Sequence, residues 1–138
     1  MSEKTEHLLY FEEQKTIFIG TIRFTCVLSA ANVAEFGLEA LKFVNAHPGL
    51  NLLLNFEKVD YLSSAVLTEL LRIKKAIDDT NGRLRLCSIS KTIQEVFEIT
   101  NLDQVFVLDS ADVDTAKNRF LRTIEVAAKE DAWKAPGS

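Results

Sequence analysis

The middle of the chain carries the clearest change in the spacing of hydrophobic positions. Residues 50–56 form an apolar run without glycine or proline, which is typical of a strand buried on both faces of a parallel sheet. The spacing then becomes helical. The apolar positions of this second segment are Val66, Leu70, Ile73 and Ile77, widened by Leu67, Leu71 and Ala76, with Thr68, Arg72, Lys75 and Asp79 on the opposite face. The pattern predicts a central strand and an amphipathic helix that begins at Ser63 or Ser64 and is closed by Gly82.

The segments before this unit predict a pair of strands and a helix. Residues 8–11 and 16–24 are rich in aromatic and β-branched side chains, and polar residues 12–15 between them indicate an antiparallel pair. Gly20 marks either a bulge, a close approach of the backbone or a simple packing accommodation. In the following helix, Asn32 and Glu35 have the spacing of a capping box, and residues 47–49 end it. Its predicted buried stripe consists of Val33, Phe36, Ala40 and Val44.

The segments after the central unit predict two further strands and two further helices. Leu84 and Leu86 alternate with arginines, and a helix capped by Ser90 follows. Residues 105–108 predict the last strand, and Asp109 or Ser110 is expected to cap a final helix. The inward positions of these helices are Ile93, Val96 and Phe97 in the first, and Val113, Ala116, Phe120, Ile124 and Ala127 in the second. Residues 129–138 lack this periodicity and are expected to fray. The order of elements predicts an α/β fold: a mostly parallel sheet with an antiparallel N-terminal edge pair and about four helices.

Length and composition narrow the class of protein. The 138 residues suit a single domain over 1–138, with a core of about 8–128. The net charge of −4 and the absence of a Lys/Arg cluster argue against nucleic acid as a partner. No apolar run reaches the roughly 20 residues that span a membrane, and no export signal is visible, so we expect a cytoplasmic protein that does not bind membranes. Cys26 and Cys87 are expected to be reduced, because neither belongs to a CxxC pair.

The residues give no sign of catalysis. The sequence contains no glycine-rich phosphate loop, HExxH or GxSxG motif, and His7 and His47 stand apart from any serine or carboxylate that would form a relay. The adjacent pairs Asp78–Asp79 and Glu12–Glu13 are interpreted as surface charge, with the glutamates in a hairpin turn. We therefore predict a protein that is not an enzyme and has no metal or cofactor site.

The paired serines at the start of the central helix admit two interpretations. A serine hydroxyl there can cap the helix, worth about 1 kcal/mol. The same place suits a phosphoserine, because a phosphate at a helix N-terminus meets free amides and the positive end of the helix dipole. One serine can cap while the other is modified.

The strand, loop, paired serines and helix resemble the central motif of the STAS domain, found in bacterial anti-sigma-factor antagonists and in sulfate transporters. That motif runs Asp, Ser, Ser or Thr, Gly, an aliphatic residue and often Gly; here Ser63 stands in place of the aspartate, and Val66 and Thr68 in place of glycines. Segment 25–29 also lacks the aspartate that is usual in the family. Residues 92–108 resemble a second recurrent stretch, with Asn101 in place of glycine and so expected in the left-handed conformation.

The resemblance implies both a fold and a function. It implies helices largely on one side of the sheet, and phosphorylation at Ser64, with Ser63 as the alternate. The implied partner is an anti-sigma factor serine kinase, which binds only the unphosphorylated form; a weak homodimer is a further candidate. The implied partner-binding residues are Ser63, Ser64, Ala65, Thr68 and Arg72. Because the motif departs from the family pattern, the alternative is a STAS scaffold or ligand-sensing module without phosphotransfer.

Overall fold

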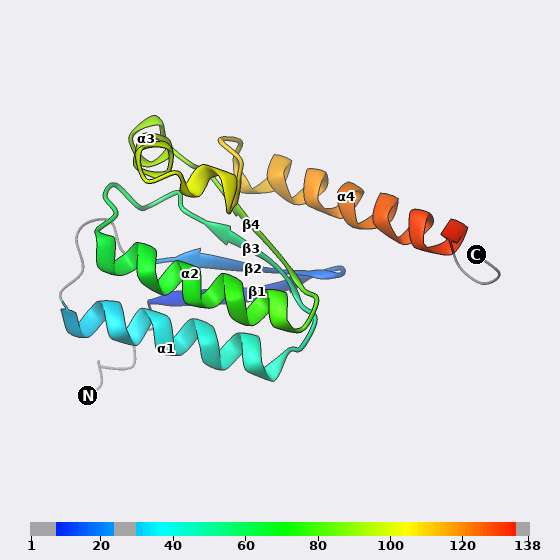
Figure 1. Ribbon diagram of the computed structural model, residues 1–138, viewed down its shortest axis with the longest axis horizontal. Coiled ribbons are helices and arrows are strands. Elements are labelled where there is room, and N and C mark those ends of the chain that lie inside the picture. The colour runs from blue at the N-terminus through cyan, green and yellow to red at the C-terminus, as the bar shows by residue number, and fades with distance from the viewer. Residues whose placement is uncertain (1–7, 24–29, 135–138) are drawn as a thin grey trace.

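The computed structural model describes residues 8–23 and 30–134, and no side-chain detail is given for 30–31 and 131–134. A five-stranded sheet has the order β1-β2-β3-β4-β5, in which β1 and β2 are antiparallel and the remaining neighbours are parallel (Figure 1). The elements are β1 Leu9–Gln14, β2 Ile17–Ile22, α1 Ala30–Ala46, β3 Asn51–Asn55, α2 Ser64–Asp79, β4 Arg83–Cys87, α3 Lys91–Ile99, the 3-10 helix η2 Leu102–Gln104, β5 Val107–Leu108 and α4 Val113–Lys134. This architecture confirms the predicted α/β fold. The last strand is shorter than expected, because Val105 and Phe106 lie outside it.

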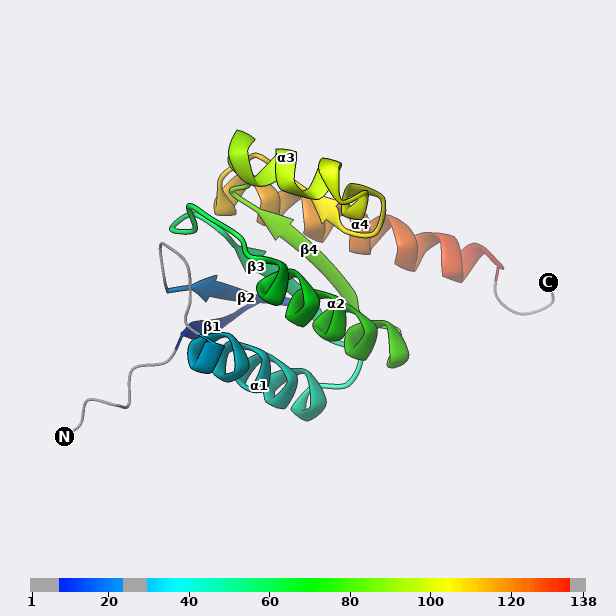
Figure 2. The ribbon, with the colours of Figure 1, turned by 60° about the vertical axis from the view of Figure 1, so that its left-hand side comes forward.

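The helices cover both faces of the sheet. Leu52 and Leu54 of β3 pack in the larger core with the buried stripes of α1, α2 and α3, whereas Leu53 packs in a second core with Ala116 and Phe120 of α4. Successive residues of a strand point to opposite faces, so the apolar run serves both cores. The expectation of helices largely on one side is met, because α1, α2 and α3 share one face of the sheet, while α4 lies on the other face (Figure 2).

The first two strands form a tight hairpin. Gln14 pairs with Ile17, so only Lys15 and Thr16 form the turn, and Lys15 has a φ of 59°. Residues 12 and 13, predicted in the turn, therefore lie within β1. The register continues without a bulge past Gly20, where a Cβ would lie 3.0 Å from the ring of Phe11 and 3.1 Å from Leu54. Gly20 is thus a packing accommodation.

The end of α2 corrects the predicted role of Gly82. Asn81 has the left-handed φ of 63°, its amide donates to the Asp78 carbonyl at 3.0 Å, and the Gly82 amide donates to the Ile77 carbonyl at 2.9 Å. This is the Schellman arrangement with asparagine in the left-handed position. Gly82 serves the close approach of chains instead, since a Cβ there would lie 2.4 Å from the Leu50 carbonyl oxygen.

Four further expectations concerning helices are wrong. Asn32 lies inside α1, which already begins at Ala30, and so does not cap it. The cap of α4 is Asp112, whose Oδ1 accepts the Thr115 amide at 2.8 Å, because α4 begins only at Val113. The same helix continues to Lys134 instead of fraying from 129. Leu71, predicted in the buried stripe of α2, is 39% exposed.

Of the remaining expectations, some concern residues that the structure describes and others concern residues outside the described ranges. Ser90 Oγ accepts the Ile93 amide at 3.2 Å, and Asn101 has a φ of 62°, so the predicted cap and left-handed residue are confirmed. Cys87 is a free, buried thiol. Segment 25–29, His7 and Cys26 lie outside the described residues. Within 8–23 and 30–134, no helix is long and apolar enough to cross a membrane.

Candidate functional site

The two serines at the start of α2 have different roles. Ser63 has an extended backbone, with φ −92° and ψ 164°, and its Oγ accepts the Val66 amide at 3.2 Å. Ser63 is therefore the N-cap and is half-buried. Ser64 is the first residue of the helix and is exposed. Its hydroxyl forms no hydrogen bond with the part of the chain that the structure describes.

The loop that leads to the serines is fixed by buried side chains. Phe56, Val59 and Leu62 are all at most 5% exposed and pack in the larger core. The side chain of Asn55 at the end of β3 accepts the Glu57 amide at 3.0 Å, and the Val59 amide donates to the Phe56 carbonyl at 2.9 Å. Because apolar residues anchor the loop at three points, the start of α2 is presented in one defined position.

Four of the five predicted partner-binding residues lie along one exposed strip of α2, and the fifth, Ser63, is the half-buried N-cap of that helix. Ser64, Thr68 and Arg72 recur every four residues and therefore share a face, and Ala65 is exposed beside them. The Thr68 hydroxyl donates to the Ser64 carbonyl at 3.0 Å, so this side chain is held against the helix. Arg72 donates to Glu69 at 2.9 Å. The strip therefore contains one ion pair and no unpaired formal charge.

Sequence reasoning missed one exposed aromatic residue next to this strip. Tyr61 is 50% exposed and lies two residues before the N-cap. Aromatic side chains are enriched in the cores of protein interfaces, because they bury a large area with few rotatable bonds. The signal that could have found it is an aromatic residue between two buried apolar positions of a loop, Val59 and Leu62.

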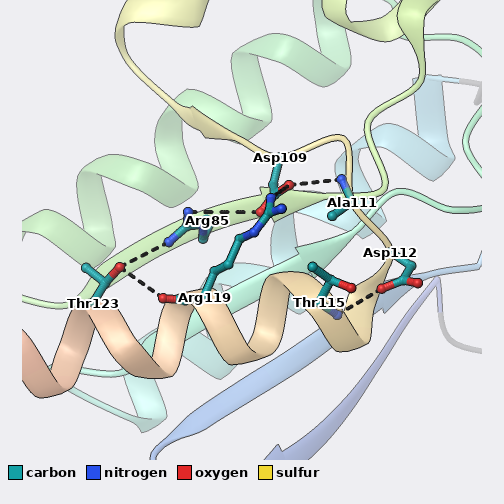
Figure 3. Close-up of polar contacts among 7 residues, drawn as sticks. All are labelled: Arg85, Asp109, Ala111, Asp112, Thr115, Arg119 and Thr123. Carbon is teal, nitrogen blue, oxygen red and sulfur yellow. Dashed lines mark hydrogen bonds and ion pairs between the residues drawn. The ribbon is translucent and has the colours of Figure 1, made fainter.

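A second polar cluster joins the end of β5 to α4 (Figure 3). Asp109, predicted as a cap, is 6% exposed as a residue, and its Oδ1 accepts the Arg119 Nη1 at 2.8 Å and the Ala111 amide at 2.9 Å. The Arg85 Nη2 lies 4.0 Å from Oδ2, while its Nη1 donates to Thr123 at 3.4 Å. The cluster binds strand to helix, and sequence reasoning missed it because its members are far apart along the chain.

The pKa values of two side chains, Cys87 and Asp112, are shifted by their surroundings. Burial raises the pKa of the Cys87 thiol to about 12, so the group is protonated at neutral pH. The amide of Thr115 donates to the carboxylate of Asp112 and lowers its pKa, since this bond favours the charged form. Among the described residues, no group of three or more His, Cys, Asp or Glu side chains is placed to hold a metal ion. Neither Cys87 nor Asp112 belongs to the site at the paired serines.

Comparisons with known proteins point to one family. The model of the STAS domain matches residues 10–119. BtrV of Bordetella bronchiseptica, named as an anti-sigma factor antagonist, is 30% identical over 80 residues, which cover 58% of this chain and 68% of that protein. The STAS domain protein of Planctomyces limnophilus, named as an anti-sigma-factor antagonist, has a TM-score of 0.70 at 20% identity, over 83% of this chain and 96% of that one.

A further solved structure has the same fold. The Bacillus cell fate determinant SpoIIAA in its phosphorylated form has a TM-score of 0.63 at 19% identity, over 80% of this chain and 97% of that one. At this identity the likeness concerns the fold alone. The family model, by contrast, matches a range that contains β2, β3 and the whole of α2, with the paired serines at the start of that helix. The chain belongs to the STAS domain family and resembles its anti-sigma-factor antagonists.

Proposed function

We propose that this protein is an anti-sigma-factor antagonist that binds an anti-sigma serine kinase and is released from it by phosphorylation of Ser64. The observation that carries the proposal is the division of roles between the two serines. Ser63 Oγ caps α2, and the exposed Ser64 hydroxyl is left without a structural role among the described residues. A kinase can therefore modify Ser64 while the helix keeps its cap.

The position of Ser64 tolerates a phosphate. At the first residue of a helix, the amides of the first turn have no partner within the helix. The capping bond of Ser63 satisfies the Val66 amide, so the amides of Ser64 and Ala65 are left to interact with a phosphate on Ser64. The positive end of the helix dipole favours the added anion by about 0.3–1 kcal/mol. Phosphorylation is therefore expected to leave the fold intact.

The same change strongly alters the surface that a partner meets. The strip of Ser64, Ala65, Thr68 and Arg72 carries only the Arg72–Glu69 pair, so a phosphate would add nearly two negative charges to a surface close to neutral. A charge buried without a partner in an interface is unfavourable, and so is the loss of a close steric fit. Release of the kinase follows without a conformational change in the antagonist.

The relatives support this proposal in two respects. BtrV is named as an anti-sigma factor antagonist, and SpoIIAA has been solved in unphosphorylated and phosphorylated forms. A fold of this kind thus exists with a phosphate in at least one member. A kinase that controls a sigma factor would place the protein in the cytoplasm.

The test is phosphorylation by a serine kinase that the protein itself captures from its source organism. The wild type is incubated with this kinase and ATP, and the peptide spanning 59–72 is analysed by mass spectrometry. We expect one phosphate on Ser64, tighter or equal kinase binding by Ser64→Ala, and binding at least about tenfold weaker by Ser64→Asp.

Ser90 provides the matched control, because it is also a serine at a helix N-terminus and caps α3 as Ser63 caps α2. Ser90→Asp should leave kinase binding unchanged. A phosphate on Ser63 instead of Ser64 would transfer the switch to the alternate residue and contradict the assignment. No phosphate on either serine, with binding insensitive to Ser64→Asp, would support a STAS scaffold or ligand-sensing module instead.

A further inference from the structure

A groove runs along α4 where this helix leaves the sheet. Its larger part, of about 650 Å³, is lined by one face of α4 between Thr115 and Glu130 and by Arg85 of β4. A smaller hollow of about 250 Å³ continues it over β4 and β5. Arg85 and Thr123 line both parts, so the two are adjacent. Figure 1 shows the C-terminal half of α4 extending past the sheet.

The lining of the groove is basic, although the protein as a whole is acidic. Five cationic side chains line its two parts: Lys74, Arg83, Arg85, Arg119 and Arg122. Only Asp78 and Glu130 among the lining residues are acidic, and Asp78 is paired with Lys74 at 2.8 Å. The whole chain has a net charge of −4. The lining therefore carries more basic than acidic side chains.

The arginines of the groove differ in the hydrogen-bond and ion-pair partners of their side chains. Arg119 is bound to Asp109, and Arg85 is fixed between Thr123, Asp109 and the ring of Phe120, whose centroid lies 5.9 Å from its guanidinium carbon. Within the ranges 8–23 and 30–134, Arg83 and Arg122 have no ion pair or hydrogen-bond partner for their side chains. These two guanidinium groups are available to an added carboxylate.

Apolar residues lie between the charges. Val126 and Ala127 of α4 line the larger part of the groove, and Val107 of β5 and Phe120 of α4 line the smaller one. Val107 is 52% exposed and Val126 is 49% exposed. The strand edge is also incomplete, because β5 pairs only with Arg85 and Leu86 and does not continue beside Arg83 and Leu84. The surface thus offers cations, apolar contacts and part of a strand edge.

We propose that this groove docks an acidic peptide segment of a partner protein in an extended conformation, with its carboxylates on Arg83 and Arg122. The helix face from Thr115 to Glu130 is about 22 Å long at 1.5 Å per residue, which matches roughly seven residues of extended chain. Carboxylates pair well with guanidinium groups, since the planar fork donates two parallel hydrogen bonds. A nucleic acid fits less well, because a phosphate backbone is bound through several clustered cations, and among the cations that line this groove Lys74, Arg85 and Arg119 already face carboxylates.

The docking surface is separate from the one proposed for the kinase. The groove is lined mainly by α4 and β4, and α2 reaches it only through Lys74 and Asp78 near its C-terminal end, whereas Ser64 stands at the first turn of that helix. The proposal therefore goes beyond the proposed function and does not depend on it. A protein with both surfaces could hold its regulator at α2 and a second, acidic component at α4.

The experiment uses the full chain and a fluorescein-labelled octapeptide of alternating glutamate and valine as the probe. We expect saturable binding by fluorescence anisotropy, weakened by salt, and backbone amide shifts in ¹H–¹⁵N spectra confined to β4, β5, α4 and the C-terminal end of α2. The variant Arg83→Gln/Arg122→Gln should bind about tenfold more weakly while keeping the same thermal midpoint, because both residues are without partners.

Three controls make the outcome decisive. Lys75→Gln/Lys91→Gln removes the same charge from exposed positions of α2 and α3 and should bind the peptide like the wild type. A peptide with glutamine in place of glutamate should not bind. Equal binding of both peptides, amide shifts centred on 63–72, or tighter binding of a single-stranded RNA octamer than of the acidic peptide would overturn the proposal.

Discussion

The carboxylate of Asp109 and the guanidinium of Arg119 meet at 2.8 Å, although the first follows β5 and the second lies in the second turn of α4. Asp109 is buried, with a side chain 4% exposed, whereas the Arg119 side chain is 57% exposed. The second carboxylate oxygen of Asp109, Oδ2, has no hydrogen-bond partner among the described residues. The pair links the end of β5 to α4, the helix that covers the second core.

Asp109→Ala should lower the free energy of unfolding by about 2 kcal/mol, because it removes the acceptor for both Arg119 and the Ala111 amide and leaves Arg85 without its nearest anion. Arg119→Gln should cost less than about 1 kcal/mol, since that side chain is largely in water. Urea unfolding of the two variants measures the difference. Equal midpoints for both would contradict the unequal burial of the pair.

A chain ending at Leu108 should lose its cooperative thermal transition, because it exposes the second core. That core consists of Ile17, Ile19, Leu53 and Cys87 on the sheet, with Ala116 and Phe120 of α4. A chain ending at Ala128 keeps these contacts and serves as the control, which should unfold cooperatively. A folded, soluble product of the shorter chain would refute a stabilising role for α4.

Asn101→Val should destabilise the protein by about 1–2 kcal/mol, since a β-branched side chain is strained at a φ of 62°. Asn101→Gly should be close to neutral, because glycine adopts this conformation readily. The urea midpoints of both variants decide the point. Equal loss of stability in the two variants would indicate that the asparagine side chain, and not its backbone angle, matters.

Ser63→Ala should lower stability by about 1 kcal/mol, whereas Ser64→Ala should change it by only a few tenths. The reason is that only the Ser63 hydroxyl accepts an amide of the first turn, at 3.2 Å from Val66. Thermal melts of the two single variants test this. If Ser64→Ala were the more destabilising, the roles of the two serines would be exchanged, and the phosphorylation site with them.

The thiol of Cys87 should react with a disulfide reagent only after unfolding. Its pKa of about 12 keeps the thiolate scarce in the folded protein, while the unfolded thiol ionises near its ordinary value of 9.0. The raised pKa means that its contribution to stability is complete below pH 9 and is lost as the pH rises toward 12. A Cys26→Ser variant isolates the reaction. Rapid labelling of the native variant at pH 8 would contradict the burial.

The sequence by itself determined the elements of this protein and their order. Hydrophobic spacing identified β3 and α2, and the caps at Ser63 and Ser90 and the left-handed Asn101 follow from local chemistry, because each depends on neighbours within a few residues. The position of Ser64 at the first turn of α2 was predictable for the same reason. The STAS resemblance rests on this local order.

The tertiary structure decided what depends on contacts between distant residues. Local signals placed Asp109 at a helix cap, but burial beside Arg85 and Arg119 made it a link between strand and helix, and Asp112 became the cap. Periodicity could not decide on which face of the sheet α4 lies, because Leu53 and its neighbours in β3 are apolar on both faces. The basic groove arises only when β4 and α4 are brought together, as the contact between Arg85 and Thr123, 38 residues apart in the chain, shows.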